Sequence, residues 1–330
     1  MSRARDLADL GGSADAGGLT GANALINGQF AVAQRGTSFT SGSNNDTDYT
    51  LDRWKLFSDG NDVVDVTQET STVPTNRQYA IALDVETANK KFGIVQIIEQ
   101  KNCVNLIGET VTLSFQAKVS ATTNLDNVKA AIIAWDGTAD EPTDDMISAW
   151  GAEGTDPTLA TNFTYENTPA NLNLTTSYAT YSVTASVDTA SAKNIIVFIW
   201  SDVTTTSAGE FLYLSDIKLE AGQTATPFDH TEDYGTTLAK CQRYYWTNIE
   251  SLNIGGGTGA GEFFRQVISW PCQMISAPVI TQSISSKNTT GDGSWAAHPD
   301  NGRYLNSTTT SNVNTSITFA AKGIKAEAEL

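Results

Sequence analysis

The apolar residues along the first two thirds of the chain recur at the spacing of β-strands. In residues 110–119 every second residue is apolar and the others are polar, as in a strand with one buried face. Residues 195–200 are continuously apolar, which predicts a central strand covered on both sides. Turn-rich stretches separate such segments. The predicted strands are Leu25–Phe30, Trp54–Phe57, Val63–Thr67, Ala80–Val85, Ile94–Ile98, Thr110–Val119, Val128–Trp135, Ala179–Ala185, Asn194–Trp200 and Glu210–Leu219.

The number and spacing of these strands predict the architecture. About ten short strands over roughly 200 residues favour one β-sandwich, a jelly roll, over residues 22–230. The acidic residues 136–169 interrupt the strands and are predicted to form a long surface loop. The predicted fold class is therefore all-β, and the alternation alone leaves the pairing order of the strands open.

The pattern changes after Pro227. Four residues at helical spacing predict a short connecting helix within residues 231–250, which the glycine-rich run 255–261 ends. Further strands predict a small C-terminal β-sandwich domain over residues 251–330; they are Glu262–Trp270, Val279–Ser285 and Ser316–Phe319. A domain this small completes its core most easily against other copies of itself. The candidates for this packing between chains are Leu238, Cys241, Tyr244 and Tyr245.

Residues 1–21 are predicted to attach the chain to a partner. Residues 2–10 have a helix-like pattern, and the small-residue run 11–18 follows as a flexible linker. A helix this short is unstable alone, so the segment is either disordered or docked onto another protein. A pair of arginines favours docking. The candidate attachment residues are Arg3, Arg5, Leu7 and Leu10.

Charge and composition narrow the range of partners. The chain has 20 Lys and Arg residues against 37 Asp and Glu residues, a formal net charge of −17. Such a surface repels phosphate backbones and anionic membranes, so we expect neither nucleic-acid binding nor membrane insertion. No segment approaches the roughly 20 apolar residues of a spanning helix, and no apolar run follows the N-terminus as in a signal peptide. We therefore expect synthesis in the cytoplasm and release by lysis or within a particle.

The sequence contains no recognisable catalytic or metal-binding motif. Cys103, Cys241 and Cys272 are far apart, which predicts buried free thiols rather than disulfides or a zinc site. His230 and His298 are too few for a histidine metal site. No Gly-x-Ser-x-Gly elbow occurs, and the glycine-rich run lacks the lysine of a phosphate-binding loop. We expect no enzyme activity, no cofactor and no metal.

Acidic residues cluster in the predicted surface loop, and three interpretations of them remain open. A glycosidase needs two carboxylates on facing walls of a cleft. Oxygen-rich loops bind calcium. A solvated acidic face needs neither arrangement, and a cluster this dense favours that interpretation. The residues are Asp140, Glu141, Asp144 and Asp145.

The tryptophans fall into two groups. Trp54, Trp135 and Trp200 lie in predicted strands, which favours packing in the core. Trp150 and Trp295 lie in turn-rich stretches. An exposed ring beside polar groups can stack on a sugar and bind its hydroxyl groups; alternatively, such a ring folds back onto its own domain. The candidate glycan-binding residues are Trp295, His298, Asp300 and Tyr304.

Three parts of the chain, in this order, carry a resemblance to a known family. They are Asn23–Phe30 with Asp52-Arg53-Trp54, Leu214–Gly222 with Leu238–Tyr245, and Phe263–Val267 with the ending Ala326–Leu330. Together they resemble a family of bacteriophage tail-fibre and virion structural proteins whose jelly roll is similar to a carbohydrate-binding module. Residues 3–10 are similar to the starts of fibre proteins from phages of aquatic bacteria. Lys55 stands where the family often has an aromatic residue, and the acidic loop has no counterpart in the family.

The resemblance implies a protein of the virion, on the tail or capsid surface, without implying a particular ligand. It implies a tail fibre or fibre-like component that attaches to other tail or capsid proteins through residues 1–21. The distal domain would adsorb to a host cell-surface glycan, and in a homotrimer several weak contacts would add up to lasting adsorption. The related jelly rolls often hold calcium beside the terminal strand, near Asp216 here. The alternatives are a capsid-decorating fibre or baseplate structural protein without receptor binding, and a glycan-degrading enzyme.

Overall fold

The computed structural model describes residues 21–248, 252–256, 263–269, 271–287, 294–297, 304–310 and 317–330, with side chains for residues 21–247, 271–281 and 325–330. The chain separates into two compact units. Unit 1 comprises the residues up to Asp233 together with Leu330, and unit 2 comprises Tyr234–Glu329. The predicted attachment residues Arg3, Arg5, Leu7 and Leu10 lie outside the described residues.

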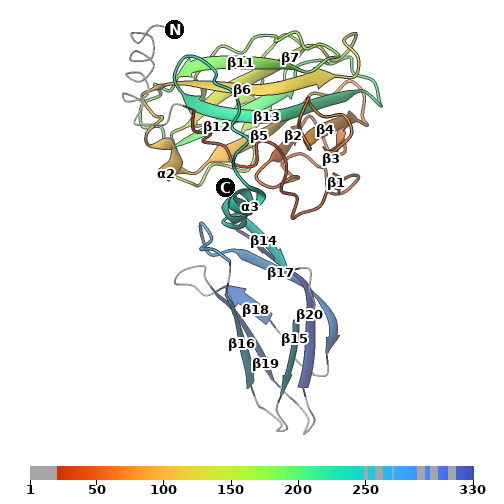
Figure 1. Ribbon diagram of the computed structural model, residues 1–330, viewed down its shortest axis with the longest axis vertical. Helices are drawn as coiled ribbons and strands as arrows, with labels where there is room; N and C mark the ends of the chain where they lie inside the picture. The colour runs from red at the N-terminus through yellow and green to blue at the C-terminus, as the bar shows by residue number, and fades with distance from the viewer. Residues whose placement is uncertain are drawn as a thin grey trace. The chain divides into compact units, whose positions relative to one another are not determined.

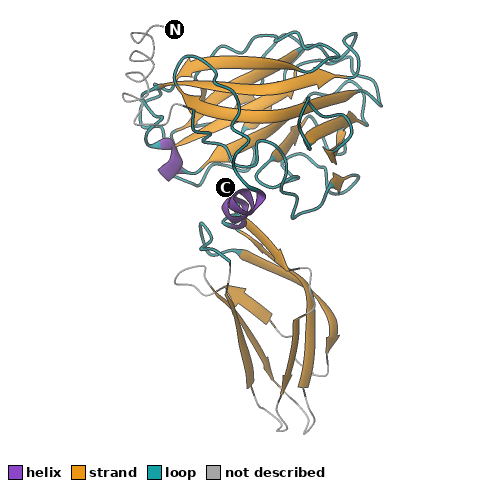
Figure 2. Cartoon of the chain, in the orientation of Figure 1, coloured by secondary structure: helices purple, strands orange, loops and turns teal. Residues whose placement is uncertain are grey.

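Unit 1 is a sandwich of two antiparallel sheets (Figures 1 and 2). The larger, which we call the β13 sheet, has the strand order β1 (Ser38–Phe39), β3 (Val64–Glu69), β4 (Ala80–Val85), β13 (Phe211–Ala221), β6 (Thr110–Val119) and β11 (Ala179–Ser186). The other, the β12 sheet, has the order β10 (Phe163–Tyr165), β7 (Val128–Trp135), β12 (Asn194–Ser201), β5 (Phe92–Ile98) and β2 (Lys55–Ser58). A short helix, α2 (Gln100–Cys103), follows β5. The predicted all-β fold class with a β-sandwich is confirmed.

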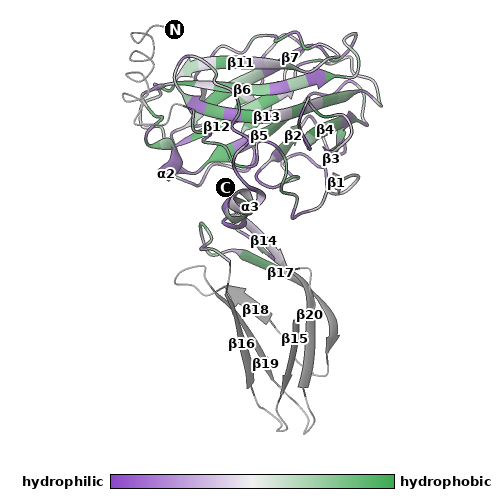
Figure 3. Ribbon diagram, viewed as in Figure 1, coloured by the Kyte–Doolittle hydropathy of each residue, from purple (hydrophilic) through white to green (hydrophobic). Residues whose placement is uncertain are grey.

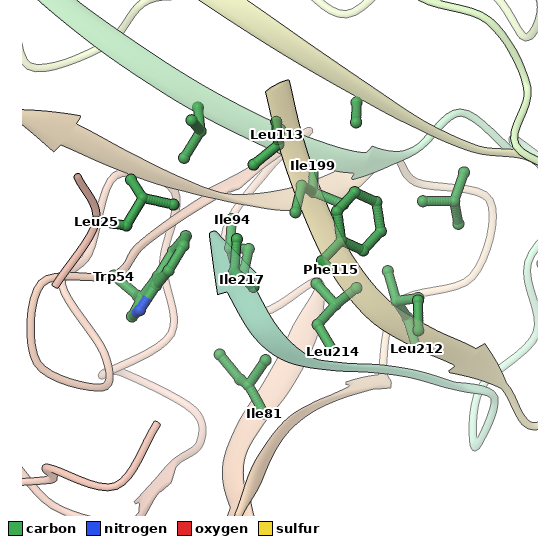
Figure 4. Packing of buried hydrophobic residues seen from close by; sticks show 14 of the residues in the cluster. Leu25, Trp54, Ile81, Ile94, Leu113, Phe115, Ile199, Leu212, Leu214 and Ile217 are labelled. Carbon is green, nitrogen blue, oxygen red and sulfur yellow. The ribbon is translucent and has the colours of Figure 1, made fainter. Parts of the chain in front are cut away.

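The core of unit 1 lies between the inner faces of the two sheets. The inward residues of β6, among them Leu113 and Phe115, pack with Leu214 of β13 and Ile199 of β12 (Figure 4). Each such side chain contributes roughly 1.5–3 kcal/mol when it is fully buried. Every residue of β12 is buried, as its continuous apolar run predicted. Trp54, Trp135 and Trp200 are likewise buried.

The predicted strand Leu25–Phe30 is wrong, because the chain turns sharply there instead. Asn27 and Phe30 have left-handed backbones, with φ of 58° and 59°. Asn27 stabilises this turn by accepting a hydrogen bond from the Val32 N–H and donating one to the Val32 carbonyl. A side chain that satisfies backbone groups in this way competes with strand pairing.

The turn joins the two motifs that carried the family resemblance. Trp54 Nε1 donates to the Asn27 carbonyl at 3.0 Å, and the rings of Phe30 and Trp54 lie 5.3 Å apart. A Cβ atom on Gly28 would lie 2.1 Å from the Ile217 carbonyl oxygen, so only glycine fits. The Asn-Gly-x-Phe and Asp-Arg-Trp motifs therefore have a structural role in the fold.

The acidic insertion 136–169 is not the surface loop that its composition predicted. It forms the short strands β8 (Ile147–Ala149) and β9 (Thr158–Leu159) and ends in the edge strand β10. Its few apolar residues, including Met146 and Phe163, join a second hydrophobic cluster with outward residues of the β12 sheet. The insertion therefore covers the outer face of that sheet.

Unit 2 begins with α3 (Tyr234–Gln242), which is shorter than the predicted helical region 231–250. The next residues form β14 (Tyr245–Asn248), which pairs with the long strand β20 (Ile317–Glu327). The other described strands are β15 (Leu252–Gly256), β16 (Phe263–Ser269), β17 (Val279–Lys287), β18 (Ser294–Ala297) and β19 (Tyr304–Thr310). β20 pairs with β14, β15 and β17, whereas β19 lies between β16 and β18.

One expectation for unit 2 is corrected. Trp295 lies in strand β18 rather than in a turn-rich loop. Of the described helices, neither is long and apolar enough to cross a membrane.

Candidate functional site

The outer face of the β13 sheet carries polar and aromatic side chains from neighbouring strands, which we call the outer-face patch. Strand alternation places Gln116 and Lys118 of β6 on the face opposite to Phe115. Tyr213 and Ser215 of β13 lie directly beside them, because the register pairs Tyr213 with Lys118 and Ser215 with Gln116. Hydrophilic segments interrupt the apolar ones along both strands (Figure 3).

A β-bulge in β13 shapes one end of the patch. The register with β6 shifts between Ser215 and Lys218, and Asp216 within the bulge has a left-handed backbone with φ of 53°. Bulges re-aim side chains in this way. The Asp216 carboxylate is 4% exposed, and its Oδ2 accepts hydrogen bonds from Arg77 Nε at 2.7 Å and Gln116 Nε2 at 2.6 Å.

The other carboxylate oxygen of Asp216, Oδ1, is buried without a hydrogen-bond partner. His230 Nε2 lies 3.9 Å from Asp216 Oδ2, too far for a hydrogen bond. The amide nitrogen of Gln29 lies 2.6 Å from His230 Nδ1, and the Phe228 ring lies 5.1 Å from the imidazole. The 36% exposed His230 ring thus lies between the buried carboxylate and solvent.

The electrostatic surroundings keep His230 neutral near pH 7. Partial burial lowers the pKa of His230 below its usual 6.5, and the Arg77 guanidinium lowers it further, against the opposing effect of Asp216. An amide N–H on Nδ1 leaves the ring proton on Nε2, which faces Asp216. At neutral pH the polar group exposed at this end of the patch is therefore the uncharged His230 ring.

Aromatic rings form the other end of the patch. The rings of Phe211 and Tyr213 are stacked, with centroids 5.5 Å apart and planes 10° apart. Lys118 Nζ lies 5.5 Å from the Tyr213 ring centre and 5.9 Å from that of Tyr178. The Tyr178 hydroxyl donates to the Thr72 carbonyl at 2.8 Å, and burial raises the pKa of Tyr178. These contacts hold the rings in one arrangement.

The charges near Asp216 are those of an ion pair rather than of a calcium site. Arg77 occupies the side of the carboxylate where a cation would bind. Among the side chains that the structure describes, no group of three or more His, Cys, Asp or Glu residues is placed to hold a metal ion. The resemblance to calcium-binding jelly rolls therefore gains no support at Asp216.

The acidic cluster of the insertion has structural contacts. Asp140 accepts hydrogen bonds from the Gln100 N–H and Asn194 Nδ2, each at 2.7 Å. Asp144 forms an ion pair with Lys55 at 2.6 Å, which holds the pKa of Asp144 below its usual value against the effect of its burial. Asp145 accepts from the Ile147 N–H. These residues fasten the insertion, so the solvated acidic face that we favoured is only part of their role.

The glycan-binding residues predicted from the sequence lie in unit 2. Trp295 of β18 pairs with Ser307, and Tyr304 of β19 pairs with Ser269, so both belong to paired strands of one sheet. His298 and Asp300 lie outside the described residues. No side-chain contact tests this group, and it stays a prediction.

The predicted packing residues are mostly used within the chain itself. Cys241, Tyr244 and Tyr245 are 0%, 1% and 2% exposed in a single copy. Leu238 is half-buried on α3 and keeps surface for a second chain. The helix ends at Gln242, so the tyrosines do not extend its face. Cys103 and Cys241 are buried cysteines outside any disulfide, as predicted, and Cys272 is a half-buried one.

Sequence reasoning missed most of the outer-face patch. Gln116 and Lys118 are polar positions of a well-predicted strand, but alternation marks them only as facing outward. Arg77, Phe228 and His230 come from turns and from the segment after β13, and nothing in their spacing connects them with Asp216. The bulge that brings them together has no sequence signal of its own.

Comparisons with known proteins give similarity of fold only. No protein-family model matches the sequence, and no curated protein matches it. Solved structures that are similar include the enzymatically active domain of tailspike protein 4 of bacteriophage CBA120, at 16% identity and a TM-score of 0.35, over 60% of this chain and 21% of that one. The chain thus matches about a fifth of the tailspike domain's length.

Carbohydrate-binding modules are also among the similar structures. The xylan-binding domain of Paenibacillus barcinonensis Xyn10C matches at 13% identity and a TM-score of 0.33, over 62% of this chain and 98% of that one. A family 16 carbohydrate-binding module matches at 14% identity and a TM-score of 0.29, over 48% and 84%. Identities and TM-scores this low assign neither a ligand nor an activity to this chain.

Proposed function

We propose that this protein is a phage virion component, a tail fibre or fibre-like part, that binds glycan on the host surface without cleaving it. Residues 1–21 attach it to other tail or capsid proteins, and it is made in the host cytoplasm. The virion assignment is supported by the three sequence stretches that resemble phage fibre proteins. The glycan assignment is supported by the outer-face patch.

The chemistry of the patch fits a sugar. A pyranose ring has an apolar face that stacks on aromatic side chains and hydroxyl groups that need donors and acceptors. The half-buried Phe211 ring, stacked on the buried Tyr213, supplies a flat apolar surface. A sugar hydroxyl group at the other end of the patch would meet the 36% exposed His230 ring as its polar partner. The observation that carries this proposal is the presence of stacked aromatic rings and polar side chains on one face of the β13 sheet.

The aromatic and polar ends together suit an extended saccharide. Tyr213 and Asp216 are three positions apart on one strand, which spans about 10 Å. Unit 2 offers a second candidate surface around Trp295, His298, Asp300 and Tyr304. Several weak sites on a multimeric particle would give lasting adsorption through avidity.

Binding of the labelled full-length protein to an array of bacterial surface polysaccharides tests the proposal. His230→Ala and Phe211→Ala should each weaken binding about tenfold, equivalent to roughly 1.4 kcal/mol. Thr158→Ala is the control, because Thr158 is exposed on β9 in the insertion, which covers the other sheet. A loss seen only with Trp295→Ala would place the site in unit 2 instead.

Absence of binding by the full-length protein, even when it is presented at high valency, would overturn glycan recognition. The capsid-decorating or baseplate role would then be favoured. Labelled density on virions separates the two placements, since a tail fibre appears at the tail and a decorating fibre on the head. Release of reducing sugar from a bound polysaccharide would instead identify an enzyme.

A further inference from the structure

The edges of the two sheets in unit 1 differ in length. Three edge strands are short: β1 has 2 residues, β10 has 3 and β2 has 4. The remaining edge strand, β11, has 8 residues and pairs with β6 along its whole length. Short edge strands are one way in which proteins avoid unwanted pairing with other chains. The long β11 edge (Figure 1) lacks this protection.

The composition of β11 also leaves this edge unprotected. Residues 179–186 read Ala-Thr-Tyr-Ser-Val-Thr-Ala-Ser, without a charge, a proline or a glycine. Lysine and proline are the residues that usually block an edge, whereas Val, Thr and Tyr favour strand pairing. In the described part of the chain, no strand pairs with the other side of β11.

Exposed apolar surface on β11 would gain from a further neighbour. Tyr181 and Val183 are on the inward face and pack against the core, yet both remain only partly buried. Their partners on β6, Phe115 and Leu113, are 1% and 0% exposed. The difference arises because β11 has a strand on one side only. Another strand would bury the remaining apolar area.

We propose that β11 pairs antiparallel with β11 of a second copy of this chain, joining two β13 sheets into one. A two-fold axis at Ser182 places Thr180 opposite Thr184 and Tyr181 opposite Val183. Residues directly opposite in an antiparallel pair share a face, so apolar side chains meet apolar ones and hydroxyl groups meet hydroxyl groups. The strand is thus complementary to itself, which is required of a two-fold pairing and not of a strand from another protein.

The charges of the chain do not prevent pairing with a second copy along β11. Two chains of net charge −17 repel each other over most of their surfaces. Along β11 no carboxylate of one copy would face a carboxylate of the other, because the strand has none. This two-fold pairing differs from the three-fold assembly that the family resemblance implies.

One consequence rests on the proposed glycan function. In the joined sheet both outer-face patches lie on the same side, since the two-fold axis is perpendicular to the sheet. From β13 of one copy to β13 of the other there are five strand steps, or roughly 24 Å. The pair would therefore present a divalent glycan-binding surface, whereas the pairing itself does not depend on any glycan.

The first test is the mass of the full-length protein by light scattering over a range of concentrations. We expect a species of twice the 35.2 kDa chain mass. Ser182→Lys should convert it to the monomer, because two like charges would meet at the two-fold axis while the exposed side chain leaves the fold intact. Thr122→Lys adds the same charge in an exposed turn as the control and should leave the dimer unchanged.

The second test is the register. In a Cys272→Ser background, Ser182→Cys should form an inter-chain disulfide on mild oxidation, because the two Cβ atoms would lie about 5 Å apart. Thr180→Cys should not, since its Cβ atoms would be roughly 14 Å apart. Cys103 would not interfere, because burial raises its pKa to about 12. A monomer or trimer at every concentration, or a dimer that Ser182→Lys leaves intact, would overturn the proposal.

Discussion

The two outer faces of the unit 1 sandwich follow the same strand alternation, but their outward side chains have different surroundings. On the β12 sheet, Phe198 and Trp200 point away from the main core, stacked 4.5 Å apart with planes 12° apart, and both are fully buried under the insertion. On the β13 sheet, the corresponding outward positions hold Tyr213, Asp216 and Lys218, which are also buried but make polar and cation–π contacts instead of joining an apolar cluster. One face has become a second core, whereas the other carries the outer-face patch.

The covered face is also held by buried charges. Lys91 pairs with Asp202 and donates to the carbonyls of Ala152 and Thr155 in the insertion, at 2.8 and 3.1 Å. Lys129 bridges Asp202 and Asp156 at 3.1 and 2.8 Å. The two faces thus differ in what surrounds their outward rings: Phe198 and Trp200 are fully buried under the insertion, whereas Phe211 at the end of β13 stays half-buried.

The largest expected effect is loss of the covered aromatic stack. Trp200→Ala should lower the free energy of unfolding by about 3–5 kcal/mol, because it removes a fully buried side chain and leaves a cavity. Phe211→Ala on the outer face of the β13 sheet removes a half-buried ring, so it should lower the free energy of unfolding clearly less. Denaturant unfolding of both variants measures the difference. Equal losses would mean that the two faces do not differ in the way we describe.

Next in size is removal of a buried ammonium group. Lys91→Met should cost about 3 kcal/mol, because Asp202 and the carbonyls of the insertion lose a partner inside the protein. Lys90→Met is the neighbouring control, because its pair with Asp59 is exposed on both sides, at 38% and 45%. Exposed pairs contribute less than about 1 kcal/mol. Similar losses in the two variants, measured by urea unfolding, would contradict the anchoring role of Lys91.

The pH dependence of the patch is a smaller effect. Because the pKa of His230 is lowered, the ring protonates only as pH falls below 6.5, and protonation pairs it with Asp216. The contribution of the neutral His230 ring to the free energy of unfolding is therefore complete above pH 6.5. It is lost as the pH falls through the lowered pKa of His230. Glycan binding by the patch should weaken severalfold between pH 7 and 5, and this dependence should be absent in His230→Ala. A pH-independent wild type would exclude His230 from the site.

The smallest expected effect is a gain in stability rather than a loss. Asp65 and Asp84 lie opposite each other on β3 and β4, on the outer face of the β13 sheet. Burial raises the pKa of each, and repulsion from neighbouring carboxylates, including Glu86, raises it further. A raised carboxyl pKa stabilises the fold at low pH, and this contribution is lost as pH rises through the folded pKa.

Asp84→Asn should therefore stabilise the protein at pH 7 by about 0.2–1 kcal/mol, because like charges directly opposite each other are unfavourable. Asp188→Asn in an exposed turn is the control and should be neutral. Thermal melts between pH 4 and 8 should show a flatter profile for Asp84→Asn. A lower melting temperature at neutral pH would contradict the repulsion.

Local pattern predicted the regular strands well. Ala80–Val85, Thr110–Val119 and Val128–Trp135 have the predicted bounds, because alternation, or an apolar run bounded by turns, is a direct consequence of burial. The turn at Asn27 was missed, since its stability comes from side-chain bonds to residues several positions away. The insertion was missed because its few apolar residues matter only beside the outward aromatic residues of the β12 sheet.

The sequence by itself determined the all-β class, the inward and outward residues of the long strands and the buried tryptophans, since each follows from local spacing and hydrophobicity. Only the tertiary structure decided which outward face is covered, because that depends on where the insertion packs. It also decided that Asp216 meets Arg77, which lies 139 positions away along the chain. Contacts between residues this far apart have no local signal, and a β-bulge with φ of 53° brings these two together.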